Sequence, residues 1–213
     1  MIYDASVTTA EIASLLRPYI ELEEKDLARI ETYVTLLRKW NARISLTSVR
    51  DPHEIVRRHF GESFFAAAQL LTVEDALTVV DFGSGAGFPG IPMAMFGRHS
   101  RFTLIEANGK KAAFLNEAIR ALGLGNAKVF SGRAEDFGER ADLVTMRAVE
   151  KFQESLPLAV TLAKPGGRVA IMIGAGQAES ASAASLKLAW QPPIAIPGGH
   201  SRILLVGKRE EHP

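Results

Sequence analysis

The sequence predicts an α/β protein with a mostly parallel, doubly wound sheet of six or seven strands and a helical N-terminal extension. From residue 77 onward, short apolar runs alternate with helical segments, which is the pattern of right-handed βαβ units with helices on both faces of a sheet. Residues 1–72 have helical spacing throughout. We expect this extension to pack on residues 73–213 as one compact unit.

The composition excludes several classes of protein. The chain has 25 Lys plus Arg against 24 Asp plus Glu, a net charge of +1, which does not indicate a bulk binder of polyanions. With 47% apolar residues it can bury a core, and its lack of cysteine excludes disulfides, thiolate metal sites and a cysteine nucleophile. Neither a signal peptide nor an apolar stretch of membrane-spanning length is present, so we expect a cytoplasmic protein that contacts no membrane.

Three helices are expected in the extension. Thr8 and Glu11 form a capping box at the start of the first. The second has apolar residues at helical spacing, namely Leu27, Ile30, Val34 and Leu37. Asp51 as N-cap, followed by Pro52, begins the third. The apolar side of that helix carries Ile55, His59, Phe60, Phe64 and Ala67.

Six strands are expected in the second part, at residues 77–80, 102–105, 127–130, 143–145, 169–173 and 203–206. A helix begins near Pro89, and another covers residues 110–122 and ends at Gly123 and Gly125. Pro165-Gly166-Gly167 predicts a turn before the fifth strand.

Three glycines at alternate positions, Gly83, Gly85 and Gly87, directly follow the first expected strand. Glycine adopts positive φ and lets a ligand approach the backbone closely, and a merely tight turn would need fewer glycines. Asp81 precedes this loop and Glu106 follows the second strand. Both carboxylates are therefore expected where parallel strands end, which is where such sheets bind ligands.

Two ligands compete for this loop. Residues 85–90 satisfy the dinucleotide fingerprint G-x-G-x-x-G, and Glu106 lies 19 residues beyond its second glycine, where a ribose-binding carboxylate is expected. However, the charge of Asp81 would oppose a pyrophosphate, and Pro89 removes a backbone N–H that phosphate would need. S-adenosylmethionine has a cationic amino acid end, a ribose and no phosphate, and it fits this pattern better than NAD.

A further candidate contact follows the third expected strand, where an adenine would lie. Segment 131–137 contains Ala134 and Glu135, and a backbone N–H and a carboxylate there can bind the adenine edge. The alternative is that Glu135 forms a solvated pair with Arg133.

Four segments carry a more specific pattern: Trp40-Asn41-x-x-Ile44-x-Leu46-Thr47, Arg58-His59-Phe60-x-x-Ser63, Asp81–Gly90 and Met146-Arg147-Ala148. Together they resemble the RsmG (GidB) family of bacterial small-subunit rRNA methyltransferases, which form 7-methylguanosine. The resemblance extends from about residue 25 to residue 207. It implies a class I (Rossmann-like) S-adenosylmethionine-dependent methyltransferase, with methyl transfer to N7 of guanine 527 in the 530 loop of 16S rRNA. The partner implied is 16S rRNA or the 30S subunit.

The resemblance also implies site residues. The cofactor contacts would be Gly83 and Phe88 in the loop, Ala134 and Glu135 after the third strand, and Arg147 after the fourth. Glu106 matches the ribose-binding position of the wider class. Many relatives have a Lys-Gly pair at the end of the fifth strand, where this chain has Ile173-Gly174. Another side chain, such as Arg202, would then have to supply that cation.

The proposed chemistry needs few groups. Guanine N7 has an in-plane lone pair and no proton, so no general base and no metal are required. Arg147 is our candidate for the catalytic residue, because a guanidinium can orient cofactor or guanine through a planar set of donors. The alternative for Arg147 is an ordinary surface arginine.

RNA binding is expected at a basic stretch. Residues 38–59 hold six basic and two acidic residues, a net charge of +4, which can bind phosphates or can be a solvated helix face. The RNA contacts we predict are Arg38, Lys39, Arg57, Arg58 and Arg202. We expect a monomer. The alternatives to this function are methylation of another acceptor, an NAD-dependent oxidoreductase, and a non-catalytic RNA-binding protein.

Overall fold

The computed structural model describes residues 6–148, 152–184, 187–198 and 201–211. In these ranges the sheet has eight strands in the order β3-β2-β1-β4-β5-β8-β6, with β7 also paired to β8. The strands β1 to β5 pair in parallel, whereas β6, β7 and β8 pair antiparallel. The strands are β1 (Thr78–Phe82), β2 (Arg101–Glu106), β3 (Ala127–Ser131), β4 (Ala141–Arg147), β5 (Ala163–Gly174), β6 (Leu188–Trp190), β7 (Ile194–Ala195) and β8 (Arg202–Arg209).

The six predicted strands are confirmed as β1 to β5 and β8, but the predicted count of six or seven is too low. Strands β6 and β7, which have only three and two residues, were not predicted. The prediction that the fifth strand begins after the turn at Pro165-Gly166-Gly167 is wrong. Strand β5 already begins at Ala163, and the turn lies inside it as an irregularity with Gly166 at a φ of +72°.

The three N-terminal helices are confirmed. The capping box of Thr8 begins α1 (Thr9–Leu16), and Asp51 caps α3 (Pro52–Glu54) by accepting a hydrogen bond from the Glu54 N–H at 2.8 Å. Between them lies α2 (Glu24–Asn41). The third helix continues through the π-helix η1 (Ile55–Phe60) into α4 (Gly61–Leu70). The π-helical segment was not predicted.

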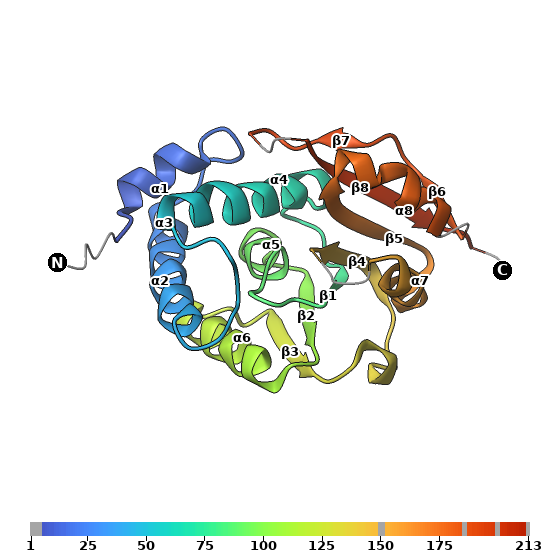
Figure 1. The fold of residues 1–213 in the computed structure, drawn as a ribbon, viewed down its shortest axis with the longest axis horizontal. Coiled ribbons are helices and arrows are strands. Elements are labelled where there is room, and N and C mark those ends of the chain that lie inside the picture. The colour runs from blue at the N-terminus through green and yellow to red at the C-terminus, as the bar shows by residue number, and fades with distance from the viewer. Residues whose placement is uncertain (1–5, 149–151, 185–186, 199–200, 212–213) are drawn as a thin grey trace.

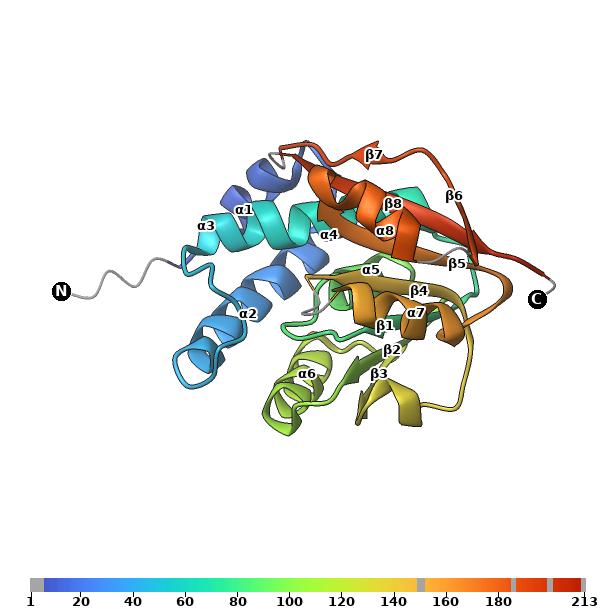
Figure 2. The same ribbon diagram turned by 45° about the vertical axis from the view of Figure 1, so that its right-hand side comes forward.

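Helices cover both faces of the sheet. One face packs on α1, α2, α4, α5 (Gly90–Phe96) and α6 (Gly109–Leu122), and the other on α7 (Phe152–Leu162) and α8 (Ala178–Ala184). Figures 1 and 2 show the N-terminal helices beside the central strands and α7 and α8 on the opposite side. Neighbouring residues of one strand point to opposite cores, as Val79 and Val80 do. The start of α5 and the end of α6 at Gly123 confirm the predicted helix boundaries.

Two short helices complete the chain: η2 (Ala134–Asp136) follows β3, and η3 (Ala175–Gln177) follows β5. None of the described helices is long and apolar enough to cross a membrane.

Candidate active site

The candidate site is a cavity of about 610 Å³ at the carboxyl ends of β1, β2 and β4. One wall is the glycine loop after β1, and the opposite wall is formed by residues 45–49 and the π-helix η1. This is the edge at which ligands of parallel sheets bind, and the volume is in the usual range for a small-molecule site. The lining residues used below are Thr47, Arg58, His59, Glu106, Arg147 and Arg202.

The glycine loop has the conformation that its sequence predicts. Gly83, Gly85 and Gly87 have φ of +64°, +55° and +81°, a region that favours glycine. A Cβ on Gly87 would lie 2.7 Å from the Ile91 side chain, whereas a Cβ on Gly85 would meet nothing closer than 3.8 Å. The space at Gly85 is therefore open to a ligand, and the space at Gly87 is filled by the protein.

Other elements hold this loop in place. The Ser84 N–H donates to the Ile105 carbonyl at 2.9 Å, and the Gly85 N–H donates to Glu106 Oε2 at 2.9 Å. From the far side, the buried Tyr33 hydroxyl of α2 donates to the Ala86 carbonyl. The loop shape is thus fixed by β2 and by the N-terminal extension together.

Asp81 lies beneath the loop and does not line the cavity. Its carboxylate accepts hydrogen bonds from the Thr145 hydroxyl at 2.9 Å and the Gly90 N–H at 3.2 Å. Burial raises the pKa of Asp81 to about 6, although the hydrogen bonds from the protein oppose that shift. Asp81 therefore connects β1, β4 and the start of α5, and its carboxylate does not point at the ligand space as the sequence analysis expected.

Glu106 lies at the tip of β2 and lines the cavity. Its two carboxylate oxygens accept backbone N–H groups, from Gly85 at 2.9 Å and from Asn108 at 2.8 Å. A carboxylate oxygen can accept more than one hydrogen bond, so Glu106 can hold the loop and accept a ligand hydroxyl at the same time.

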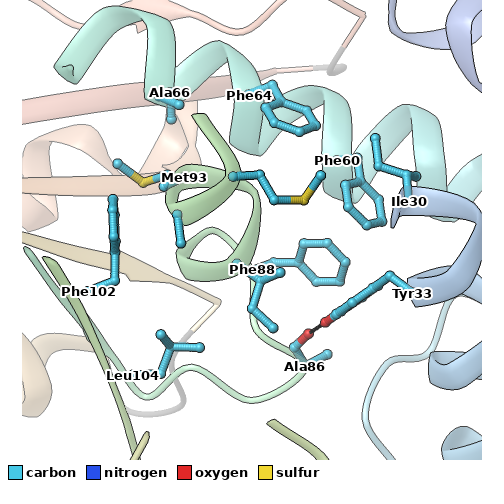
Figure 3. Close-up of a cluster of buried hydrophobic side chains, with 14 of the residues drawn as sticks. Ile30, Tyr33, Phe60, Phe64, Ala66, Ala86, Phe88, Met93, Phe102 and Leu104 are labelled. Atoms are coloured by element: carbon cyan, nitrogen blue, oxygen red, sulfur yellow. Dashed lines mark hydrogen bonds between the residues drawn. The ribbon is translucent and has the colours of Figure 1, made fainter. Parts of the chain in front are cut away.

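Phe88 belongs to both the cavity and the core. Its ring contacts Tyr33, Phe60 and His59 with centroid separations of 5.5, 5.1 and 5.0 Å. Figure 3 shows Phe88 between Phe60 and Tyr33, with Ala86 next to the Tyr33 hydroxyl. The Arg147 guanidinium carbon lies 5.9 Å from the centre of the same ring. Phe88 thus joins the loop, the helical extension and the end of β4.

A buried carboxylate that was not predicted, Glu62, forms ion pairs with two arginines. Glu62 of α4 is 2% exposed, and its Oε2 lies 2.8 Å from Nη2 of Arg147 and 3.3 Å from Nη2 of Arg202. Arg147 ends β4 and Arg202 begins β8. Three nitrogen atoms of these arginines, Nε of Arg147 and Nε and Nη2 of Arg202, are buried without a hydrogen-bond partner, although Nη2 of Arg202 is within ion-pair distance of Glu62. One acid therefore faces two cations, and the cluster has a net positive charge.

His59 links this cluster to the loop wall of the cavity. Its Nδ1 lies 3.0 Å from Arg147 Nη2, and its Nε2 lies 2.9 Å from the Thr47 hydroxyl. Burial lowers the pKa of His59 to about 3, and the charges of Arg147, Arg58 and Arg202 add to the effect. The ring is therefore neutral at physiological pH. Burial likewise lowers the pKa of Arg147 to about 10, which leaves its guanidinium charged at neutral pH.

Trp40 and Asn41, at the end of α2, position the cavity wall formed by residues 45–49. The side-chain oxygen of Asn41 accepts from the Leu46 and Thr47 N–H groups, and its amide donates to the Thr47 carbonyl. Trp40 packs on Phe114 of α6 and donates to Glu117 at 3.0 Å. Trp40 is thus a packing anchor, and Asn41 holds the loop that carries Thr47.

The structure does not bring all predicted residues to the cavity. Ala134 and Glu135 lie in η2 at the same edge of the sheet, next to the tip of β2, because the Gly132 N–H donates to the Glu106 carbonyl at 3.1 Å. Neither lines the cavity, and Glu135 lies 3.6 Å from Arg133 in an exposed ion pair.

Of the predicted RNA contacts, some line the cavity and others lie outside it. Arg58 and Arg202 line the cavity, as does Lys111. Arg57 lies outside it and donates to both carboxylate oxygens of Glu54, and Arg38 and Lys39 are at the end of α2. Ile173 is buried, and Gly174 pairs with Arg202 in the sheet. Arg202 therefore emerges next to the end of the fifth strand, where the resemblance leads us to expect a cation.

The residues present fit S-adenosylmethionine. The open backbone at Gly85 and the carboxylate of Glu106 suit an uncharged ribose. The unpartnered N–H groups of Arg147 and Arg202 suit an oxyanion such as a carboxylate or a phosphate. In the described part of the chain, no group of three or more His, Cys, Asp or Glu side chains could hold a metal ion.

Two solved structures with a similar fold are methyltransferases. A ribosomal protein L11 methylase from Lactobacillus delbrueckii subsp. bulgaricus matches with a TM-score of 0.60 at 16% identity, over 72% of this chain and 79% of that one. A SAM-dependent O-methyltransferase from Thermotoga maritima matches with a TM-score of 0.56 at 17% identity, over 70% and 64%. At such identities the similarity shows the fold alone, a Rossmann-like methyltransferase fold, and confirms the fold class predicted from the sequence.

Sequence comparisons are more specific. The profile described as rRNA small subunit methyltransferase G (GidB) matches residues 26–193. The ribosomal RNA small subunit methyltransferase G of Stenotrophomonas maltophilia is 40% identical over 78% of each chain. That of Streptococcus agalactiae is 35% identical over 93% of this chain and 90% of the relative. This chain belongs to the rRNA small subunit methyltransferase G family.

Proposed function

We propose that this chain transfers a methyl group from S-adenosylmethionine to N7 of guanine 527 in the 530 loop of 16S rRNA. Its family membership makes it an rRNA methyltransferase that uses S-adenosylmethionine, and the atom, the nucleotide and the assembled substrate are our proposal. The observation that carries it is that one cavity lies between the glycine loop and the wall formed by Thr47, His59 and Arg147. Cofactor and base can therefore meet in a single space.

The cofactor side of the cavity is the glycine loop. Gly83, Gly85, Phe88 and Glu106 line it and would hold the cofactor, while Asp81 and Gly87 would shape the loop from behind. When bound, S-adenosylmethionine supplies an electrophilic methyl group on a sulfonium. We retain Ala134 and Glu135 as proposed contacts for its adenine end, because they lie at the neighbouring strand tip.

The acceptor side needs positioning rather than proton transfer, because guanine N7 has a lone pair and no proton. Arg147 ends β4 with its guanidinium held by Glu62 and His59, so it is fixed before substrate arrives. We propose that Arg147 orients the reactants through its charged N–H donors.

RNA would approach over the cationic rim of the cavity. Arg58, Lys111 and Arg202 line the cavity, and we propose that they contact backbone phosphates, with Arg38, Lys39 and Arg57 further out. Such contacts make binding depend on salt concentration. We propose that the enzyme acts as a cytoplasmic monomer on 16S rRNA or on the 30S subunit.

The experiment is transfer of tritiated methyl from S-adenosylmethionine to 30S subunits from a strain that lacks this enzyme. Naked 16S rRNA is tested in parallel, and primer extension after cleavage at 7-methylguanosine locates the modified base. We expect label at one guanine of the 530 loop. Label at another nucleotide or on protein would refute the proposed acceptor, and cofactor binding without any transfer would favour an RNA-binding role without catalysis. Displacement of S-adenosylmethionine by NAD would favour the dinucleotide alternative.

A further inference from the structure

Thr47 lines the cavity, and its hydroxyl lies at the end of a hydrogen-bonded chain. The chain runs from Glu62 through Arg147 and His59 to Thr47, with N···O or N···N distances of 2.8, 3.0 and 2.9 Å. Its members come from α4, β4, η1 and the loop after α2. The direction of each hydrogen bond can be derived, because one member can only donate.

Arg147 fixes the tautomer of His59. A guanidinium has donors and no acceptor, so Nδ1 of His59 must accept the hydrogen bond from Arg147 Nη2. The ring is neutral and has a single N–H, which must then be on Nε2. The Nε2–H donates to the Thr47 hydroxyl oxygen at 2.9 Å.

The Thr47 oxygen receives a second donor. The Val49 N–H donates to it at 3.2 Å, so both acceptor positions of the hydroxyl oxygen are used. What remains is the hydroxyl hydrogen, for which the described part of the chain offers no acceptor. The Thr47 backbone is held on both sides by Asn41, and Thr47 lines the cavity. Its hydroxyl hydrogen is therefore free to donate to a ligand in the cavity.

We infer that Thr47 is a specificity-determining residue that donates a hydrogen bond to O6 of the target guanine. The edge of guanine that carries N7 also presents O6, and both atoms are acceptors, whereas the same edge of adenine presents an N6 amino donor. A hydroxyl that can only donate matches guanine and opposes adenine. The match with O6 rather than N7 leaves the N7 lone pair free to react. This inference rests on the proposed function and names how the same cavity selects its base.

The test is a double-mutant cycle between the hydroxyl and O6. Thr47→Val removes the hydroxyl and keeps the β-branched shape, and 2-aminopurine at the target position of reconstituted 30S subunits removes O6 and keeps N7. We expect the wild-type enzyme to lose about 10-fold in kcat/KM for N7 methylation on 2-aminopurine. Thr47→Val should lower kcat/KM on guanine by a similar factor. For this variant, replacing guanine by 2-aminopurine should then lower kcat/KM by less than about 2-fold more.

Independent losses would overturn the inference, because a purely structural role of Thr47 lowers the rate equally on both bases. Thr47→Ser keeps the donor and should retain the wild-type preference for guanine. Thr32→Val, at an exposed threonine of α2 that donates to the Ala28 carbonyl, is the matched control and should equal wild type on both substrates. Absence of label on guanine with the wild-type enzyme would instead refute the proposed function, so the two failures are distinguishable.

A second measurement needs no variant. The nitrogen chemical shifts of the His59 ring in the wild-type protein report its tautomer directly. We expect the neutral Nε2–H form at pH 7. The Nδ1–H form would make Thr47 the donor to His59, which would remove the hydrogen from the cavity and overturn the inference even if Thr47→Val does not fold.

Discussion

At the scale of single residues, the site depends on charges that are buried together. Arg147, our proposed catalytic residue, lines the cavity and is held by Glu62 and His59. We expect Arg147→Ala to lower kcat/KM for rRNA methylation by about 100-fold, the loss of a hydrogen bond to a charged group. Methyl transfer to 30S subunits measures this. The control is Arg140→Ala at an exposed arginine just before β4, and full activity of Arg147→Ala would remove Arg147 from the catalytic site.

Glu62 is the single acid between two arginines, and its loss should affect stability. Removing one partner of a buried ion pair leaves an uncompensated charge, which typically costs about 3–5 kcal/mol. We expect Glu62→Gln to lower the free energy of unfolding by about 3 kcal/mol in urea denaturation. Glu74→Gln, at an exposed carboxylate before β1, should change it by less than about 0.5 kcal/mol. Equal values for the two variants would contradict the role given to Glu62.

His59 makes stability depend on pH. Its pKa is about 3 in the folded protein against 6.5 for the unperturbed side chain, so below pH 6.5 the unfolded chain binds a proton that the folded chain does not. The contribution of His59 to the free energy of unfolding is therefore fully present above pH 6.5, and it is lost as the pH falls toward 3. Relative to pH 7.5, the loss at pH 5 is about 2 kcal/mol.

We test this by the difference in unfolding free energy between wild type and His59→Gln. The difference should become about 2 kcal/mol smaller from pH 7.5 to pH 5. Asp81 acts in the opposite direction, because a carboxyl with a raised pKa stabilises the folded state as it becomes protonated near pH 6, but it is present in both proteins and cancels. His99→Gln, at an exposed histidine, is the matched control variant.

At the scale of elements, two helices begin with glycine after a strand, and the structure gives the two glycines opposite roles. Gly90 begins α5, and a Cβ there would lie 2.6 Å from Asp81 Oδ2. Gly109 begins α6, and a Cβ there would meet nothing within 4 Å. We expect Gly90→Ala to lower the free energy of unfolding by about 1–3 kcal/mol through overpacking. Gly109→Ala should leave it unchanged or raise it by up to about 1 kcal/mol.

Urea denaturation of the two variants compares them directly. If Gly90→Ala is as stable as Gly109→Ala, the contact between Asp81 and the start of α5 does not constrain that helix.

Elements also show what a sequence can predict. The six longer strands and the glycine loop were predictable because each is encoded by a local pattern of apolar residues and glycines. Glu62 was not, since it lies on the apolar side of a helix and its burial depends on arginines from β4 and β8, far away in the chain. Strands β6 and β7 are too short for a periodic signal and exist because they pair with β8. Ala134 and Glu135 were placed at the right edge of the sheet, but whether they face the cavity is set by tertiary packing.

At the scale of the whole molecule, the helical extension and the sheet share one core. The same cluster contains Tyr33 and Phe60 from the extension and Phe102 and Leu143 from the sheet. The two tryptophans report on the two parts, because Trp40 lies in α2 and Trp190 in β6. We expect the single-tryptophan variants Trp40→Phe and Trp190→Phe each to unfold in urea in one transition, followed equally by fluorescence and by circular dichroism.

Within each variant the two signals should have the same midpoint. A fluorescence transition of Trp40 that precedes the loss of sheet structure would mean that residues 1–72 unfold as a separate unit.

The anchoring of the glycine loop has a consequence for how the cofactor arrives. Tyr33 of α2, together with Glu106 and the Ile105 carbonyl of β2, holds the loop backbone through contacts of the protein itself, so the loop loses conformational entropy when the chain folds. Ligand binding then has little further ordering to achieve, and more of the contact energy remains as affinity. Association should accordingly follow a single second-order step, with a rate that rises linearly with cofactor concentration and no slow isomerisation after the encounter.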